Sequence, residues 1–251
     1  MRHLTLKRLW LIQAGANLTL VALIYLWLGI RDARLSQLLA TAILGALIAF
    51  IALWLHASAF AYFAGGQPPV LTPVFRETIR RLAPFAVLVV LFLLVWWALN
   101  SLQAPLHRAA QWTASTLTFR SRKPVRPATV GAIFSWLLWL VQWVTVPILA
   151  LPIAAAVAKS GWIGFKPGAF QRSRDWRFWF AYLIAIAGGF YLPYRLVHYA
   201  PALHGTAAEL LSFVVRFGLA YFLVITGWLA LAFFSSGGSP RVTHPVTAVS
   251  P

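Results

Sequence analysis

Residues 35–64 read LSQLLATAILGALIAFIALWLHASAFAYFA, a run of 30 residues that contains no Asp, Glu, Lys or Arg. The hydrocarbon core of a bilayer is about 30 Å thick, and about 20 apolar residues in a helix are enough to cross it. This stretch is therefore predicted to be a transmembrane helix. It is long enough to tilt in the bilayer or to extend beyond it.

Apolar stretches of similar length recur along the rest of the chain, and Gly, Pro and Arg interrupt them. Because Gly and Pro break helices, these interruptions are expected to be the ends of separate spans. The sequence predicts an all-α polytopic integral membrane protein, a bundle of six transmembrane helices with short basic loops. One domain, residues 1–234, would hold them, followed by a flexible tail, 235–251, rich in Ser, Gly, Pro and Thr. The predicted spans are 9–30, 35–64, 84–102, 128–158, 178–196 and 210–234.

The composition supports this class and excludes several others. Hydrophobic residues make up 61% of the chain and charged residues 10%, against about 45–50% and about 25% in soluble domains. The net charge of +17 suggests nucleic-acid binding, but the cations lie between the spans, so the expected partners are anionic lipid headgroups instead. The chain has no cysteine, which excludes disulfides and thiolate chemistry.

Two segments between the spans are expected to lie at the membrane surface. Residues 73–82 carry one apolar stripe, Phe75, Ile79 and Leu82, and are predicted to be an interfacial helix. An N-terminal extension of the next span is an equally good interpretation. Residues 103–127 are predicted to be the longest loop. Its first half is open to a second surface helix, and its second half is expected to be basic and extended because of its prolines.

The distribution of cations predicts the orientation. An even number of spans puts both termini on the same side of the membrane. More Lys and Arg lie on the side of the N-terminus, which favours cytoplasmic N- and C-termini in a bacterial inner membrane. The basic segment 103–127 runs against this trend, so its sidedness stays open. A re-entrant hairpin would place it on the cytoplasmic side.

The strongest functional signal is Arg216, which falls inside an apolar span. An ionised side chain within the bilayer is costly and usually faces protein or water. We predict an outward-facing pocket in which two arginines hold a lipid phosphate or another amphiphilic anion, while neighbouring histidines and a carboxylate respond to protonation. An ion pair between Glu209 and Arg216, or a snorkelling Arg216, is the structural alternative. The predicted ligand-binding residues are Arg195, Arg216, Glu209, His198 and His204.

Catalytic and metal-binding motifs are absent from the sequence. Only four acidic residues occur, and there is no HExxH, GxSxG, P-loop or dinucleotide fingerprint. No catalytic residue, metal site or cofactor is therefore assigned, and enzymatic activity is not favoured. His56 could ligate haem, but no second histidine is expected opposite it within the bilayer. Hydrogen bonding of His56 to a neighbouring helix is the preferred interpretation.

Other polar and aromatic residues within the spans are expected to serve packing. Gln13, Asn17, Asn100 and Gln142 are predicted to form interhelical hydrogen bonds. One face of the fourth span carries Trp136, Trp139 and Trp143. Anchoring at the membrane interface and packing within the bundle explain this face better than an aromatic ligand groove does.

The sequence thus favours a non-enzymatic protein that binds or transports a lipid or an amphiphilic anion. One alternative is an accessory or assembly subunit of a larger membrane complex, with a membrane-protein partner or a second copy of this chain. A haem- or quinone-linked redox protein is the other.

Overall fold

The computed structural model describes residues 2–30, 34–65, 70–199, 201 and 205–237, and the elements within these ranges are all helical. The tail beyond residue 237 lies outside the described residues. Two π-helical segments, η1 (Val141–Thr145) and η4 (Ala187–Tyr191), and two 3-10 segments, η2 (Gly161–Phe165) and η3 (Pro167–Arg174), join longer helices. The α-helices are α1 (Arg2–Leu28), α2 (Leu35–Ala64), α3 (Leu71–Arg80), α4 (Leu82–Ser101), α5 (Gln103–Ser121), α6 (Pro127–Leu140), α7 (Val146–Ser160), α8 (Trp176–Ile186), α9 (Leu192–His198) and α10 (Thr206–Ser235).

Within the described residues, six helical stretches are long and apolar enough to cross a membrane. This confirms the predicted all-α polytopic membrane protein. The stretches are Thr5–Leu28, Leu35–Ala64, Leu82–Ser121, Pro127–Phe165, Trp176–His198 and Thr206–Ser235.

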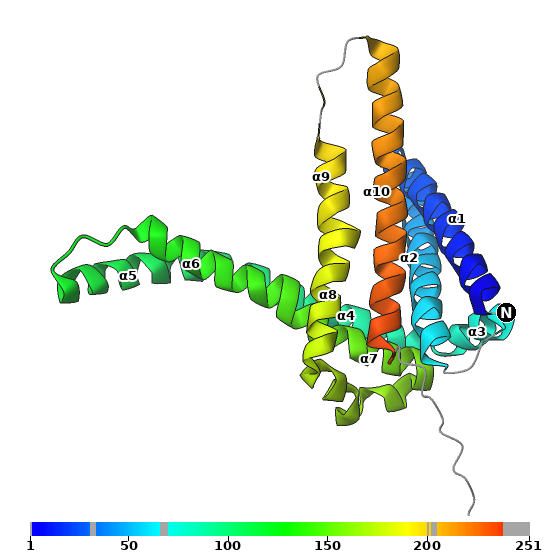
Figure 1. The fold of residues 1–251 in the computed structure, drawn as a ribbon, viewed down its shortest axis with the longest axis horizontal. Helices are drawn as coiled ribbons and strands as arrows, with labels where there is room; N and C mark the ends of the chain where they lie inside the picture. The colour runs from blue at the N-terminus through cyan, green and yellow to red at the C-terminus, as the bar shows by residue number, and fades with distance from the viewer. Residues whose placement is uncertain (1, 31–33, 66–69, 200, 202–204, 238–251) are drawn as a thin grey trace, which may run out of the picture.

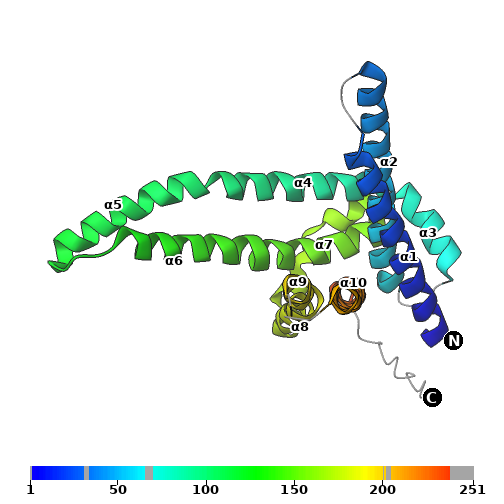
Figure 2. The ribbon, with the colours of Figure 1, turned by 90° about the horizontal axis from the view of Figure 1, so that it is seen from above.

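The spans pair into three hairpins in the described part of the chain. These are α1 with α2, α4–α5 with α6–α7, and α8–α9 with α10. The hairpins meet at one end, and their tips point in different directions (Figures 1 and 2). We call the shared end the base. The start of α1, the short helix α3, the segments η2 and η3, and the end of α10 all lie there (Figure 1).

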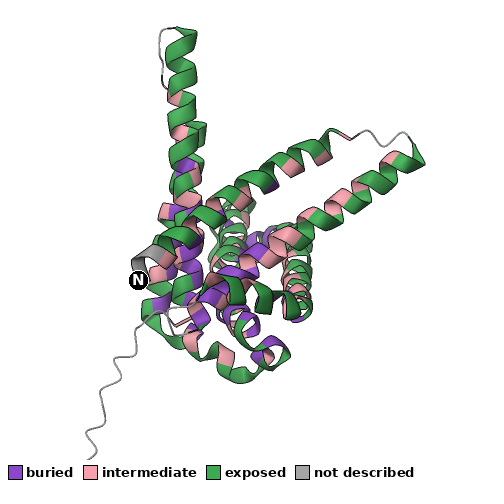
Figure 3. Cartoon of the chain, turned by 90° about the vertical axis from the view of Figure 1, so that its right-hand side faces the viewer, coloured by how far each residue is buried: buried purple, intermediate pink, exposed green. Residues whose placement is uncertain are grey.

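The main hydrophobic core is located at the base. Ala57 and Phe60 of α2, Phe85 of α4, Val157 of α7 and Ala232 of α10 are buried together. The alanines allow the helix backbones to approach closely, which is how helices pack where lipid removes the hydrophobic driving force. Buried residues gather where the helices meet, whereas the projecting parts of the hairpins are mostly exposed (Figure 3).

Pro147 changes how the fourth span docks. A proline has no N–H, so the carbonyl four residues earlier loses its usual helical donor. That carbonyl belongs to Trp143, in the π-helical segment η1, and the hydroxyl of Tyr182 on α8 donates a hydrogen bond to it. The missing donor follows from the chemistry of proline itself. The structure shows that a tyrosine of the next hairpin replaces it.

Pro152 has a parallel effect one turn further along α7. It deprives the Ile148 carbonyl of its helical donor, and Oγ of Ser173 donates to this carbonyl at 3.1 Å. Ser173 belongs to η3, and its own carbonyl accepts from the indole N–H of Trp179 at 2.7 Å. The two prolines therefore create acceptors through which α7 binds the elements that follow it.

Of the polar residues expected to link helices, Gln13 does so within the first hairpin. The buried side chain of Gln13 donates to the Leu55 carbonyl on α2 at 2.9 Å, which confirms its interhelical role. Asn17 instead donates to the Gln13 carbonyl of its own helix at 2.8 Å. His56 packs edge-on against Trp228 of α10, with ring centroids 4.8 Å apart. Among the described residues, its Nδ1 atom has no hydrogen-bond partner, so a ring contact takes the place of the expected hydrogen bond there.

The predicted surface helix before the third span forms as α3. The backbone at Arg81 (φ −105°, ψ 7°) separates α3 from α4, so α3 is a helix of its own rather than an extension of the span. The indole of Trp54 on α2 donates to the Phe75 carbonyl at 2.9 Å. The guanidinium of Arg81 donates to Glu77 at 2.9 Å and to carbonyls at the end of α7. These contacts attach α3 to the base.

The segment expected to be the longest loop, 103–127, is mostly helical. Helix α5 fills its first part, and only residues 122–126 connect α5 to α6. Ala110 and Ala114 pack against Val130 of α6, so a tertiary contact stabilises a helix that its local composition specifies weakly. Helix α5 ends at Ser121, and the next residue, Arg122, adopts the left-handed conformation (φ 55°). The second hairpin is consequently much longer than predicted.

Candidate ligand-binding site

Arg216, the centre of the predicted site, bonds to backbone carbonyls. Its Nη1 atom donates to the Leu196 carbonyl of α9 at 3.4 Å, and its Nε atom donates to the Ser212 carbonyl at 3.2 Å. The carbonyls in the last turn of a helix lack helical donors, and a cation there also complements the helix dipole. Arg216 therefore fastens the end of α9 to α10. Among the described residues, Glu209 forms no ion pair with it.

Among the described residues, no hydrogen bond or ion pair joins Arg216 to the side chains of the other predicted residues. His198 bonds through Nδ1 to the Tyr194 carbonyl at 2.8 Å and packs on the Tyr194 ring. Arg195 and Glu209 are exposed, and His204 lies outside the described residues. A ligand-binding role for Arg195, Arg216, Glu209, His198 and His204 stays a prediction.

A cleft of about 1020 Å³ lies in the second hairpin, and we call it the arm cleft. It opens between α4–α5 on one side and α6–η1 on the other. Polar, aromatic and basic side chains line it. These residues are Trp96, Asn100, Gln103, Ala104, Leu106, His107, Arg108, Gly131, Ser135, Leu138, Trp139, Gln142 and Trp143.

The first helix of this hairpin, α4–α5, bends beside the cleft. The helix turns at Leu102, between α4 and α5 (Figure 2). Pro105 follows in the first turn of α5, where it cannot donate to the Ser101 carbonyl. Beyond the bend, α5 and α6 come close together again. A Cβ at Gly131 of α6 would lie 3.8 Å from the Cβ of Ala110 on α5. The cleft is therefore open at the bend and closed toward the tip.

An amide pair crosses the cleft. Gln142 is 6% exposed, and its Nε2 atom donates to Oδ1 of Asn100 on α4 at 3.0 Å. Both residues were predicted to form interhelical hydrogen bonds, and the structure shows that they bond to each other. Gln142 lies in η1, and π-helical turns often occur at functional sites. The pair places unshared donor and acceptor positions of two amides beside an apolar wall.

Tryptophans form that wall. The rings of Trp96 and Trp143 meet edge to face, with centroids 4.9 Å apart. Trp139 also lines the cleft, whereas Trp136 does not and is 62% exposed. The predicted aromatic face of the fourth span is thus divided between the cleft and the outer surface. Interfacial anchoring accounts for Trp136, but the other two line a hollow, as a groove requires.

The charge of the arm cleft is positive. His107 and Arg108 lie on α5 at the cleft, and the lining residues include no carboxylate. A guanidinium without an acidic partner is suited to a phosphate or a carboxylate. Sequence reasoning allowed a surface helix over this segment but assigned His107 and Arg108 no role. The packing of that helix against α6, which places both residues at the cleft, was not predicted.

The described residues contain no group of three or more His, Asp or Glu side chains that could hold a metal ion. His107 is the one histidine among the cleft residues, and no Asp or Glu lines the cleft with it. The arrangement is therefore suited to binding an anion with an apolar part, and it lacks the paired groups that acid–base catalysis uses. No known protein family, curated protein or solved structure matches this chain.

Proposed function

We propose that this multi-pass membrane protein is non-enzymatic and binds a lipid or another amphiphilic anion in the arm cleft. The observation that carries the proposal is the combination, in one cleft, of an arginine that forms no ion pair with any described residue, an amide pair and a tryptophan wall. Arg108 would hold the anionic group, Asn100 and Gln142 would hydrogen-bond polar atoms beside it, and the tryptophans would cover apolar carbon. A volume of about 1020 Å³ is at the upper end of typical small-molecule sites.

The position of the cleft along the hairpin supports an amphiphile. Helix α4 has 20 residues, and at about 1.5 Å per residue it is about 30 Å long, the thickness of the hydrocarbon core. The junction of α4 with α5 would then lie near the membrane surface remote from the base. Tryptophans are typical of that level. A headgroup would bind at Arg108, and its tail would extend along α4 into the hydrocarbon.

Lipid binding by the purified full-length protein tests this proposal. In detergent, native mass spectrometry would compare phosphatidylglycerol with phosphatidylcholine of the same chain length. Arg108→Gln should weaken phosphatidylglycerol binding about tenfold, because a charge-assisted hydrogen bond is lost. Arg120→Gln, on the same helix but outside the cleft, is the matched control. Equal affinities for the two variants would contradict the proposal.

A second candidate is an accessory subunit of a larger membrane complex or a homo-oligomer. It is favoured by the divergence of the hairpin tips, which leaves apolar helix faces exposed between them (Figures 1 and 3). Helices of another chain would fit between the diverging hairpins. Purification in mild detergent would distinguish this role, because a stoichiometric partner supports it and a monomer without a partner contradicts it.

The proposed location is a bacterial inner membrane with both termini in the cytoplasm. The start of α1 and the end of α10 lie at the base together with the cations of α3 and η3 (Figure 1). Positive loops remain preferentially cytoplasmic, so this common position supports the orientation. Protease accessibility of tags at both termini in inverted vesicles tests it.

A further inference from the structure

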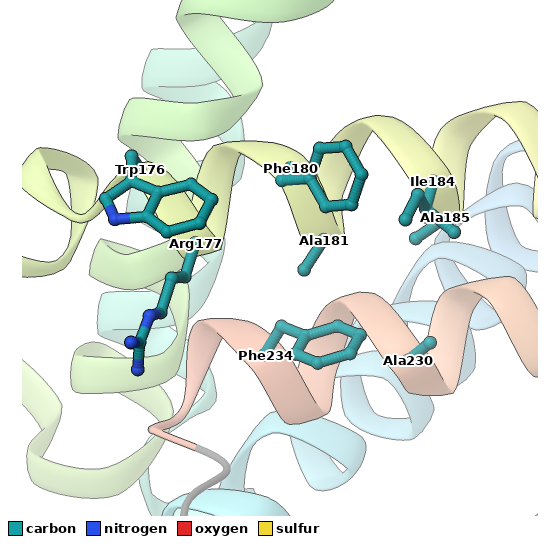
Figure 4. A pocket seen from close by; sticks show the side chains of 8 residues that line it. All are labelled: Trp176, Arg177, Phe180, Ala181, Ile184, Ala185, Ala230 and Phe234. Atoms are coloured by element: carbon teal, nitrogen blue, oxygen red, sulfur yellow. The ribbon is translucent and has the colours of Figure 1, made fainter.

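A second hollow lies at the base, between α8 and α10, and it shares no lining residue with the arm cleft. It has a volume of about 380 Å³, and we call it the base groove (Figure 4). Seven of the lining residues are apolar and one is a cation. They are Trp176, Arg177, Phe180, Ala181, Ile184, Ala185, Ala230 and Phe234.

Small side chains make the hollow and aromatic ones border it. Ala181 and Ala185 lie one helical turn apart on α8, and Ala230 lies on α10 (Figure 4). Phe180 and Phe234 stand on opposite sides of the space between them (Figure 4). One turn beyond Ala185, the two helices are in backbone contact, because a Cβ at Gly189 would lie 2.6 Å from Cα of Gly227. The groove therefore ends where the helices touch.

A cation and an interfacial aromatic residue stand at the open end of the groove. Trp176 is 71% exposed, and the guanidinium carbon of Arg177 lies 5.9 Å from the centre of its ring. Among the described residues, Arg177 forms no ion pair. The nearby carboxylate of Asp175 accepts a hydrogen bond from the backbone N–H of Arg177 at 2.9 Å instead. The guanidinium is thus available to an external anion.

The neighbouring sequence places this end of the groove at the headgroup level. Segment η3, which precedes α8, contains Arg172 and Arg174, and α8 itself is apolar after Arg177. Tryptophan and arginine at the start of an apolar span are typical of the membrane interface. The apolar part of the groove then lies within one leaflet of the hydrocarbon core.

We infer that the base groove binds an anionic glycerophospholipid, with one acyl chain between α8 and α10 and the phosphate on Arg177. One cation at the interface matches the negative charge of one lipid headgroup, and the apolar part of the base groove below it matches one acyl chain. A soluble anion would leave this apolar part unused. A zwitterionic phospholipid would fill it but bring a positive group near Arg177. The base groove and the arm cleft have no lining residue in common.

Lipid titration of the full-length, delipidated protein tests the inference, with Arg108→Gln as the background so that the arm cleft does not contribute. Native mass spectrometry would follow phosphatidylglycerol, phosphatidylcholine and glycerol 3-phosphate. Arg177→Gln should weaken phosphatidylglycerol binding about tenfold and change phosphatidylcholine binding little. Arg174→Gln, an exposed neighbour that does not line the groove, is the matched control.

A variant that fills the base groove tests whether an acyl chain binds there. Ala181→Leu should weaken binding of both phospholipids, because the longer side chain occupies the space of the chain. Equal phosphatidylglycerol affinity of Arg177→Gln and Arg174→Gln would overturn the inference. So would glycerol 3-phosphate binding as tightly as phosphatidylglycerol. If Ala181→Leu lowers the thermal stability, the comparison of the two arginine variants decides alone.

Discussion

The base of this protein and the projecting parts of its hairpins, which we call the arms, are built from the same apolar residues but are stabilised differently. At the base, Phe60 is 1% exposed and Val157 is fully buried, each in contact with residues of other helices. On the second hairpin, Ile133 is 54% exposed and Phe119 is 87% exposed. Protein packing therefore holds the base, whereas the arms depend on the bilayer as their solvent. Equal hydrophobicity in a membrane protein does not imply equal burial.

The largest predicted loss of stability comes from a substitution in the core of the base. Phe60→Ala should lower the free energy of unfolding by about 3 kcal/mol, because the cavity would remove contacts with Phe85 and Trp228. Phe119→Ala on the arm should change it by less than about 0.5 kcal/mol. Unfolding in mixed detergent micelles, followed by circular dichroism, measures both. A similar loss for the two variants would contradict the distinction between base and arm.

The next effect concerns the third hairpin, which packs along most of its length. Gly227→Leu should cost about 2 kcal/mol, because its Cβ would meet the backbone of Gly189 and the helices would have to separate. Gly218→Leu, where nothing lies within 4 Å of a new Cβ, is the control on the same helix. The same unfolding measurement applies. Equal stability of the two variants would show that α10 does not pack closely against the backbone at Gly189.

Smaller effects are expected where prolines free carbonyls near the base. Ser173→Ala should cost about 1–2 kcal/mol, because it leaves the buried Ile148 carbonyl without a donor. Tyr182→Phe should do the same for Trp143. Ser115→Ala is the arm counterpart, since its hydroxyl bonds only within its own exposed helix. Thermal unfolding in detergent separates them, and an equal shift for Ser115→Ala would argue against the special role of the freed carbonyls.

The smallest predicted change in stability is at Arg216. Arg216→Ala should cost about 1 kcal/mol and release the end of α9, because it removes the hydrogen bond to Leu196. Hydrogen exchange of residues 192–198 would detect the release while the rest of the protein stays protected. The ligand hypothesis predicts in addition a weaker binding of anionic lipid, and unchanged lipid binding would remove Arg195 and Arg216 from consideration as a ligand site.

The candidate sites show how far sequence reasoning reaches. Gln142 and Asn100 were identified as polar residues needing partners within the membrane, which follows from local composition. Their pairing with each other depends on the register of two long helices, which no local pattern contains. A helix containing His107 and Arg108 was allowed by the sequence, but its packing against α6 through Ala110 and Ala114, which places them at the cleft, depends on the same register. The base groove consists of residues from α8 and α10, far apart in the chain.

The sequence alone determined the six membrane spans and the helical class, and Pro147 and Pro152 remove a backbone donor wherever they lie in a helix. Each depends on local properties, such as the length of an apolar run set against bilayer thickness and the missing N–H of proline. The tertiary structure decided the divergence of the hairpins, the donors to the freed carbonyls and the positions of the two hollows. These depend on which helix faces meet, and in lipid, where most faces are equally apolar, only close packing and a few polar contacts select among them.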